Sequence, residues 1–146
     1  MIRLLDPDDF NAWLEIAAEV EDLFGPMVEI KEFRDAISEC IINNNAYCAE
    51  NSTGETAGII AINREKNEIE WLAVRQKERG KGYSNLLMEK AISEMVSHGP
   101  IYVQTFSGEI EEGKSARSLY FKYGFKDLRP AGKNPAQKDT VIMVRY

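Results

Sequence analysis

The sequence predicts a single α+β domain in which helices cover one mixed, mostly antiparallel sheet. Three strand-like runs follow one another between residues 46 and 74 with only short polar turns between them, which indicates an antiparallel meander. Helical patterns occur on both sides of this meander, so strands and helices do not alternate throughout as in a parallel α/β fold. The 146 residues and 44% hydrophobic composition suffice for one core, and we expect one domain over residues 1–146.

The first third of the chain predicts a short strand and two amphipathic helices. Residues 2–5 form the strand, and Asp6 follows as a helix N-cap with Pro7 at the first helical position. The break FGPM at residues 24–27 separates this helix from a second one, which ends at the asparagines of residues 43–45. Each helix has an apolar stripe at helical spacing: Phe10, Trp13, Leu14, Ala17 and Ala18 in the first, and Phe33, Ala36, Ile37, Cys40 and Ile41 in the second.

The rest of the chain predicts three strands, a helix, a strand, a helix and two strands. A strand-helix-strand unit over residues 67–106 contains a glycine-rich turn at the carboxyl end of its first strand. The expected bounds are 46–50, 56–64 and 67–74 for the meander, 80–97 for the helix, 101–106 for the next strand, 115–123 for the last helix, and 125–128 and 140–146 for the final strands.

Composition limits the partners of the protein. The 18 basic and 24 acidic residues give a formal charge of -6, which disfavours nucleic acid as the principal partner. The charged amino terminus does not resemble a signal peptide and no apolar run is long enough for a membrane span, so we expect a cytosolic protein without a membrane partner. Cys40 and Cys48 lack CxxC spacing and a neighbouring histidine, so we expect reduced thiols and no metal site.

Two stretches compete as phosphate-binding loops. GEIEEGKS at residues 108–115 satisfies the GxxxxGK[ST] pattern of nucleotide hydrolases. Three of its residues are glutamates, which would repel a triphosphate, and residues 116–146 are too few for the further parallel strands of such folds. ERGKGYS at residues 78–84 instead joins a strand to a helix N-terminus and combines basic side chains with two glycines, which favours a pyrophosphate there. A solvated basic turn is the alternative interpretation of this second stretch.

Two segments carry a resemblance to a known family. VRQKERGKGYSNLLMEKAI at residues 74–92 resembles the acetyl-CoA-binding motif of the GNAT N-acetyltransferase superfamily, and ARSLYFKYGF at residues 116–125 resembles its second signature, AxxLYxKxGF. The order of elements matches as well, so the resemblance covers the whole chain. It implies a central sheet of about seven strands flanked by about four helices, with a splayed parallel strand pair at the cofactor site.

The function implied by the resemblance is transfer of an acetyl group from acetyl-CoA directly to a primary amine of a small molecule or a protein. A non-catalytic acyl-CoA-binding or regulatory module of the same fold is the alternative. Homodimers are frequent in proteins of this kind, so a homodimer is a further expectation. No metal is expected in this mechanism.

The resemblance also assigns cofactor-binding residues. The backbone of Leu72, Ala73 and Val74 would bind the pantetheine arm, and a bulge is expected near Trp71 to re-aim groups beside the site. The pyrophosphate would be held by the loop and first helical turn: Arg79, Gly80, Lys81, Gly82, Tyr83 and Ser84. Three positions depart from the family pattern: Ser84 replaces a glycine or alanine, Gln76 a proline, and Gly113 an asparagine that often contacts the cofactor.

Catalysis needs an acid for the leaving thiolate and a base for the amine. Tyr120 stands where the family places its general acid, although it also falls on an apolar helical stripe and is a candidate for the core. Glu70 is the candidate base, and Glu68 lies two residues away on the same strand face. A solvent-facing ion pair with Arg64 or Lys66 is the alternative for both; it is the favoured interpretation of Glu68 and explains Glu70 equally well.

The acceptor site is expected near the break between the first two helices. By the resemblance, this segment walls the acceptor. Trp13 and Phe24 would line its apolar part, and Glu21 would attract a cationic amine, although an exposed charged helix face explains Glu21 equally well.

Overall fold

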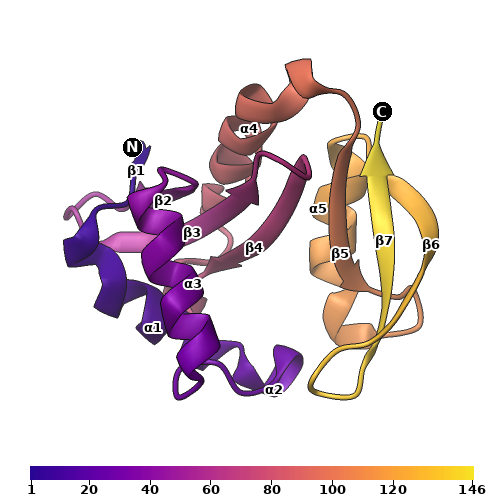
Figure 1. Cartoon of the computed structure of the whole chain (residues 1–146), viewed down its shortest axis with the longest axis horizontal. Helices are drawn as coiled ribbons and strands as arrows, with labels where there is room; N and C mark the ends of the chain where they lie inside the picture. The colour runs from indigo at the N-terminus through magenta and orange to yellow at the C-terminus, as the bar shows by residue number, and fades with distance from the viewer.

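Seven strands form one sheet in the computed structural model, which describes all of residues 1–146, and their order is β1-β2-β3-β4-β5-β7-β6 (Figure 1). Every neighbouring pair is antiparallel except β4 and β5, which are parallel. The strands are β1 (Ile2–Leu4), β2 (Ala46–Glu50), β3 (Thr56–Asn63), β4 (Glu68–Val74), β5 (Ile101–Phe106), β6 (Lys126–Lys133) and β7 (Asp139–Arg145). The expected mixed sheet of an α+β fold is thereby confirmed.

Five α-helices accompany the sheet: α1 (Phe10–Glu19), α2 (Glu21–Phe24), α3 (Lys31–Ile42), α4 (Tyr83–Met95) and α5 (Lys114–Lys122). The expected number was about four, and the additional one is the four-residue α2 just before the predicted break. Helix α4 begins at Tyr83 and not at Gly80, because Gly80 and Gly82 adopt positive φ angles of 78° and 89° that are incompatible with a right-handed helix. None of the helices is long and apolar enough to cross a membrane.

The strand near residues 125–128 was predicted too short. Strand β6 has eight residues, and its register against β7 is interrupted by irregularities near Leu128 and Ala131. Almost all of its residues are exposed because it is the edge strand of the sheet, so no alternation of apolar and polar residues marks its length.

The amino terminus is tied to α1 by a capping arrangement. Asp6 accepts a hydrogen bond from the backbone N–H of Asp8, and the Asp9 carboxylate accepts one from the backbone N–H of Asp6 at 2.8 Å. The predicted N-cap therefore exists, but it caps a short 3-10 turn (Pro7–Asp9) that leads into α1. Asp9 also forms a two-point ion pair with Arg3 on β1, at 2.8 and 2.9 Å.

The sheet is covered on both faces. Alternate residues of β3 enter two different clusters, Ile60 and Ile62 in one and Ile59 and Ala61 in the other. The first cluster packs the sheet against α4 and α5, and the second packs it against α1 and α3, which Figure 1 shows in front of β2 and β3. Cys48 is buried in the second cluster, and both cysteines are free thiols.

The pairing of β4 with β5 extends over only two residues, Glu68 with Tyr102 and Ile69 with Val103. Beyond this point the two strands separate, and Figure 1 shows the gap between them in the middle of the molecule. Ala61 on β3 pairs with Trp71, and Ile62 pairs with Ile69, so Glu70 is an extra residue in β4. The predicted bulge near Trp71 is confirmed.

Candidate active site

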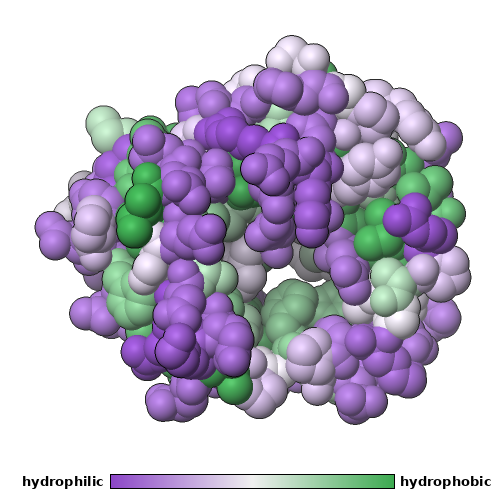
Figure 2. All heavy atoms as spheres, viewed as in Figure 1, coloured by the Kyte–Doolittle hydropathy of each residue, from purple (hydrophilic) through white to green (hydrophobic).

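A cavity of about 490 Å³ occupies the gap between β4 and β5. Its walls include residues of both strands, the loop before α4, the first turns of α5, the α2 segment and the loop between β6 and β7. Figure 2 shows the corresponding hollow near the centre of the molecule, with apolar surface on its lower side. Because the strands diverge here, the cavity reaches both faces of the sheet.

The edge of β4 that faces this cavity has unpaired backbone groups. Leu72, Ala73 and Val74 pair with β3 on one side, but β5 has already left their other side. Strand β5 beyond Val103 likewise pairs only with β7. Backbone N–H and C=O groups along a strand edge are strong hydrogen-bonding partners, so an extended amide-containing ligand fits into this gap as an added strand.

The loop from Glu78 to Ser84 closes one end of the cavity. The N–H groups of Gly80, Lys81 and Gly82 donate to no backbone carbonyl of the protein. A Cβ atom built on either glycine meets nothing within 4 Å, so open space lies against the backbone. With the free N–H groups of the following helix terminus, this loop presents a positive, donor-rich surface suited to a phosphate group.

The basic side chains of this loop have different surroundings. Arg79 is exposed and its Nε donates to the carbonyl oxygen of Val74 at 3.3 Å, which places the guanidinium beside the end of β4. Lys81 lies 3.3 Å from the buried carboxylate of Glu78, which also accepts from Asn51. Arg79 is thus the unpaired cation of the loop. Tyr83 and Ser84 begin α4 and also line the cavity.

Tyr120 projects from α5 into the same cavity. Only 6% of the residue is exposed, its ring packs edge-on against Phe125 at 5.7 Å, and its hydroxyl has no hydrogen-bonding partner in the protein. Burial raises the pKa of this phenol well above its ordinary value, so the proton stays on the oxygen at neutral pH. Tyr120 is thus buried like a core residue and also lines the cavity, where a general acid would have to lie.

Glu68 and Glu70 line the opposite side of the cleft. Ile69 packs in the cluster under α4, so Glu68 before it and Asn63, which is paired with Glu68, project to the other face. Glu70 is exposed and accepts from Asn63 Nδ2 at 2.8 Å. Burial, followed by the negative charge of Glu70, raises the pKa of Glu68, and the more weakly acting Lys66 does not offset this.

The expected ion pair between Glu68 and Arg64 does not form. Arg64 instead donates to Glu94 at 3.2 Å and to the hydroxyl of Tyr47 at 2.8 Å, on the α4 side of the sheet. Arg64 in the β3–β4 turn and Glu68 at the start of β4 therefore point to opposite faces, and Glu68 is left without an ion pair. Local proximity in the sequence was the reason for the expectation, and strand alternation is the reason it fails.

Gln104 and Thr140 complete this side of the cleft and were not singled out from the sequence. The Thr140 hydroxyl donates to the carbonyl oxygen of Gly132 at 2.8 Å and accepts from Gln104 Nε2 at 3.0 Å. Gln104 therefore turns its amide nitrogen to Thr140 and leaves its carbonyl oxygen free. Its position as the one long polar residue of the apolar run IYVQTF was the signal available in the sequence.

The three expected acceptor residues have different positions. Phe24 lines the cavity and stacks on Phe106, with ring centroids 5.1 Å apart. Trp13 lies in the core, 2% exposed, and reaches the cleft only through Trp71, whose ring is 5.6 Å away. Glu21 accepts from the backbone N–H groups of Met27 and Val28, which lowers its pKa. Trp13 and Glu21 thus support the wall and do not line it.

A bridge across the open end of the cleft joins the two halves of the molecule. We call the loop at residues 134–138, between β6 and β7, the β6–β7 loop. Asn134 Nδ2 donates to the carbonyl oxygen of Leu23 at 3.0 Å. Pro135 packs so closely on Gly25 that a Cβ atom there would lie 2.6 Å from the proline side chain. The α2 segment and the β6–β7 loop, which Figure 1 shows facing one another, together wall this end.

The segment GEIEEGKS does not form a phosphate cradle. Glu111–Gly113 is a 3-10 turn that leads directly into α5, and Lys114 Nζ is paired with Glu111 at 2.7 Å. Gly113 packs against β5: a Cβ atom at this position would lie 2.4 Å from the Cβ of Phe106. An asparagine at this position, frequent in the family that the sequence resembles, has no room here.

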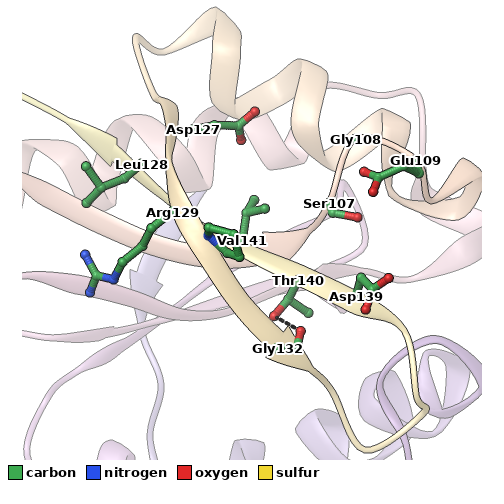
Figure 3. A pocket seen from close by; sticks show the side chains of 11 residues that line it. Ser107, Gly108, Glu109, Asp127, Leu128, Arg129, Gly132, Asp139, Thr140 and Val141 are labelled. Atoms are coloured by element: carbon green, nitrogen blue, oxygen red, sulfur yellow. Dashed lines mark hydrogen bonds between the residues drawn. The ribbon is translucent and has the colours of Figure 1, made fainter.

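A second hollow, of about 590 Å³, lies between β6, β7 and the turn after β5 (Figure 3). Two of its four charged residues form ion pairs, Asp127 with Arg117 at 2.8 Å and Asp139 with Lys133 at 2.9 Å. Neither β4 nor the loop before α4 contributes to it. The chemistry described above is thus confined to the cleft between β4 and β5.

The sheet contains one parallel strand pair, β4 and β5, and these two strands separate around the cleft. A sequence model described as an acetyltransferase (GNAT) domain matches residues 16–145. The chain therefore belongs to the GNAT acetyltransferase family, as the two sequence segments predicted. No curated protein sequence matches the chain significantly.

Solved structures of N-acetyltransferases share the fold. The ribosomal-protein-alanine N-acetyltransferase of Brucella melitensis has a TM-score of 0.77 at 18% identity, covering 99% of this chain and 98% of its own. An N-acetyltransferase of Staphylococcus aureus Mu50 has a TM-score of 0.76 at 20% identity, with coverages of 99% and 96%. The PaiA N-acetyltransferase of Thermoplasma acidophilum, in complex with coenzyme A, has a TM-score of 0.74 at 18% identity, covering 99% of this chain and 97% of its own. These structures show the fold, and the family match assigns the chain to the GNAT acetyltransferases.

Proposed function

We propose that the protein transfers the acetyl group of acetyl-CoA directly to a primary aliphatic amine that enters the cleft from the side of α2. The observation that carries this proposal is the cavity between β4 and β5. It has a donor-rich loop and an unpartnered phenol on one side, and two carboxylates on the other. A direct transfer needs both substrates in one cavity, and a cleft open to both faces of a sheet provides this.

The residues present fit acetyl-CoA. The free strand edge at Leu72, Ala73 and Val74 is suited to the amides of the pantetheine arm. The N–H groups from Gly80 to Ser84 and the guanidinium of Arg79 are suited to the pyrophosphate, and Lys81 adds charge that Glu78 partly neutralises. Bound acetyl-CoA supplies a thioester carbonyl carbon, and the protein orients the groups around it.

The reaction is a balanced exchange of two bonds. The lone pair of the neutral amine forms a bond to the thioester carbonyl carbon, and the carbon–sulfur bond breaks. The buried phenol of Tyr120 donates its proton to the departing thiolate, and a carboxylate on β4 takes the proton that the amine nitrogen loses. The raised pKa of Tyr120 keeps that proton available at neutral pH, because the phenol is not ionised beforehand.

Glu70, the base expected from the sequence, has a rival in Glu68. Glu68 lies in the first of the two residue pairs that join β4 to β5, it lines the cavity, and burial raises its pKa. A carboxylate with a raised pKa is a better proton acceptor, since its basicity is closer to that required at neutral pH. We therefore assign the base role to Glu68, acting directly or through water. Glu70 is then not required as the base.

Binding and turnover are tested separately. Titration calorimetry with acetyl-CoA is expected to show binding at micromolar to tens of micromolar concentration, and thiol release on an amine panel to show turnover. In Tyr120→Phe we expect kcat/KM to fall about 10²-fold with acetyl-CoA affinity retained. Tyr123→Phe is the matched control, because that hydroxyl bonds to Glu89 and Asn85 on α4 and not to the cleft.

The alternative of a non-catalytic binding module has a distinct outcome. Tight acetyl-CoA binding without thiol release on any amine would establish that module and contradict transfer. Absence of acetyl-CoA binding would contradict both. The cytosolic location and the homodimer remain predictions from the sequence. If a dimer forms, simple extension of the sheet at β6 is disfavoured by Pro130 and by the irregular register of that edge.

A further inference from the structure

The acceptor side of the cleft, bounded by α2 and the β6–β7 loop, carries negative charge without a matching cation. Glu68 and Glu70 line it, and neither forms an ion pair. Arg79 is the single basic residue of the cavity wall, and it lies at the opposite, cofactor end beside Val74. The field in this part of the cavity therefore favours a cationic ligand.

The neutral polar groups on this side have the same preference. Gln104 is held by Thr140 so that its carbonyl oxygen, a pure acceptor, is free. One oxygen of Glu70 accepts from Asn63 and the other has no partner in the protein. The free carboxylate oxygens and the free carbonyl oxygen of Gln104 are hydrogen-bond acceptors, and an ammonium group, which has only donors, matches them. Trp71 and Phe24 add aromatic surface of the kind that attracts cations and packs on methylene groups.

One carboxylate more is present than the reaction needs. The reacting amine must be neutral, and the base that takes its proton becomes neutral in turn. The other carboxylate, the exposed Glu70, keeps its charge throughout. It therefore attracts a second positive charge on the same substrate, outside the reacting nitrogen. The unpartnered hydroxyl of Tyr120, more than nine-tenths buried, independently identifies the cavity as a ligand site.

The two walls of the cleft are joined at this end by the contacts of Asn134 with Leu23 and of Pro135 with Gly25. The volume of about 490 Å³ has to hold the acetyl thioester together with the acceptor, which favours a small acceptor.

From these observations, and resting on the proposed function, we propose that the acceptor is a linear aliphatic diamine or polyamine. Its reacting nitrogen lies at Glu68, and its second ammonium is bound by Glu70 and the carbonyl oxygen of Gln104. Glu70 is in this view a specificity-determining residue and not a catalytic one.

Four acceptors test the proposal in the thiol-release assay. Three are four-carbon amines, 1,4-diaminobutane, butylamine and 4-aminobutanoate, and the fourth is a short neutral peptide whose lysine side chain has a four-carbon stem. We expect kcat/KM for the diamine to exceed that for butylamine at least tenfold, and 4-aminobutanoate to be the poorest. The ratio of kcat/KM for the diamine to kcat/KM for butylamine is expected to fall as salt rises from about 0.05 to 0.5 M, because salt screens the charge of an exposed carboxylate.

Variants locate the effect. In Glu70→Gln the ratio of diamine to butylamine is expected to fall about tenfold, mainly through KM for the diamine. Glu65→Gln removes the same charge from the exposed β3–β4 turn outside the cavity, and is expected to keep the ratio. Circular dichroism establishes that both variants are folded.

The failures are distinguishable. Equal rates for butylamine and the diamine, or an unchanged ratio in Glu70→Gln, would overturn the substrate assignment while leaving acetyl transfer intact. A lysine peptide faster than every free amine would overturn it in favour of a protein acceptor. Thiol release on none of the acceptors, despite acetyl-CoA binding, would instead contradict the proposed function itself.

Discussion

Replacing Gly113 by alanine tests whether the start of α5 determines the position of Tyr120. The added Cβ would lie 2.4 Å from the Cβ of Phe106 and 2.8 Å from its ring, whereas ordinary contacts begin near 3.4 Å. Gly113 has φ of -90° and ψ of -6°, which alanine adopts without strain, so the whole cost is steric. The helix must therefore move by roughly 1 Å from β5, which is the space missing at the shorter of these contacts.

The magnitude follows from this overlap. Inserting a methyl group into a packed site costs about 1 to 3 kcal/mol, and about 3 °C of Tm is lost per kcal/mol in a domain of this size, so we expect Tm to fall by roughly 3 to 9 °C. A displacement of about 1 Å at the catalytic acid reduces kcat by up to ~10²-fold.

Gly108→Ala is the matched control in the same segment. A Cβ there would meet only the Arg117 guanidinium, at 3.8 Å, and neither glycine has a positive φ angle. Its Tm is expected to stay constant or rise slightly, because alanine restricts the unfolded chain. Calorimetric scans and steady-state kinetics on both variants check the prediction. Equal Tm and equal kcat for Gly113→Ala and the parent would refute the reasoning.

Two further predictions concern the cofactor loop and the amino terminus. Arg79→Ala and Gly82→Glu are each expected to weaken acetyl-CoA binding at least tenfold by titration calorimetry. The first variant removes the unpaired cation, and the second places a carboxylate at the free N–H groups. Lys114→Ala is expected to leave the affinity constant, and the reverse pattern would identify GEIEEGKS as the phosphate-binding segment. The hydrogen bond from Arg3 lowers the pKa of Asp9, so its stabilisation is fully present above the ordinary carboxyl pKa, about 4, and is lost as pH falls through the lowered value. Asp9→Asn should therefore cost about 1 to 2 kcal/mol in urea unfolding at pH 7 and distinctly less at pH 3; an equal cost at both pH values would contradict the ion pair as its source.

Much of the architecture followed from local patterns. The meander between residues 46 and 74 was visible because half-buried and buried strands separated by turn residues have a characteristic composition. The loop at residues 78–84 was visible because glycines, basic residues and a helix start occur together within a few positions. The strand bulge at Glu70 was inferred correctly from the resemblance, and its register is seen in the pairing of Ala61 with Trp71. These features depend on residues close together in the chain.

The acceptor side of the cleft was predicted less well, because its properties arise from contacts between distant segments. Trp13 was expected in the cleft, but Trp71 lies between it and the cavity. Glu21 was expected to attract the acceptor, but the loop after α2 uses its carboxylate as a hydrogen-bond acceptor. Glu68 was expected to pair with Arg64, which strand alternation places on the opposite face.

The sequence by itself determined the order of elements, the family and the loop suited to the cofactor, since each depends on spacing within a short segment and on side-chain type. The tertiary structure alone decided which charges remain unpaired in the cleft and how its open end is walled. The contact from Asn134 to Leu23 spans 111 positions, and no periodicity or motif encodes such a contact. Electrostatic environment is a property of three-dimensional neighbours, and for this reason the choice between Glu68 and Glu70 rests on the folded chain.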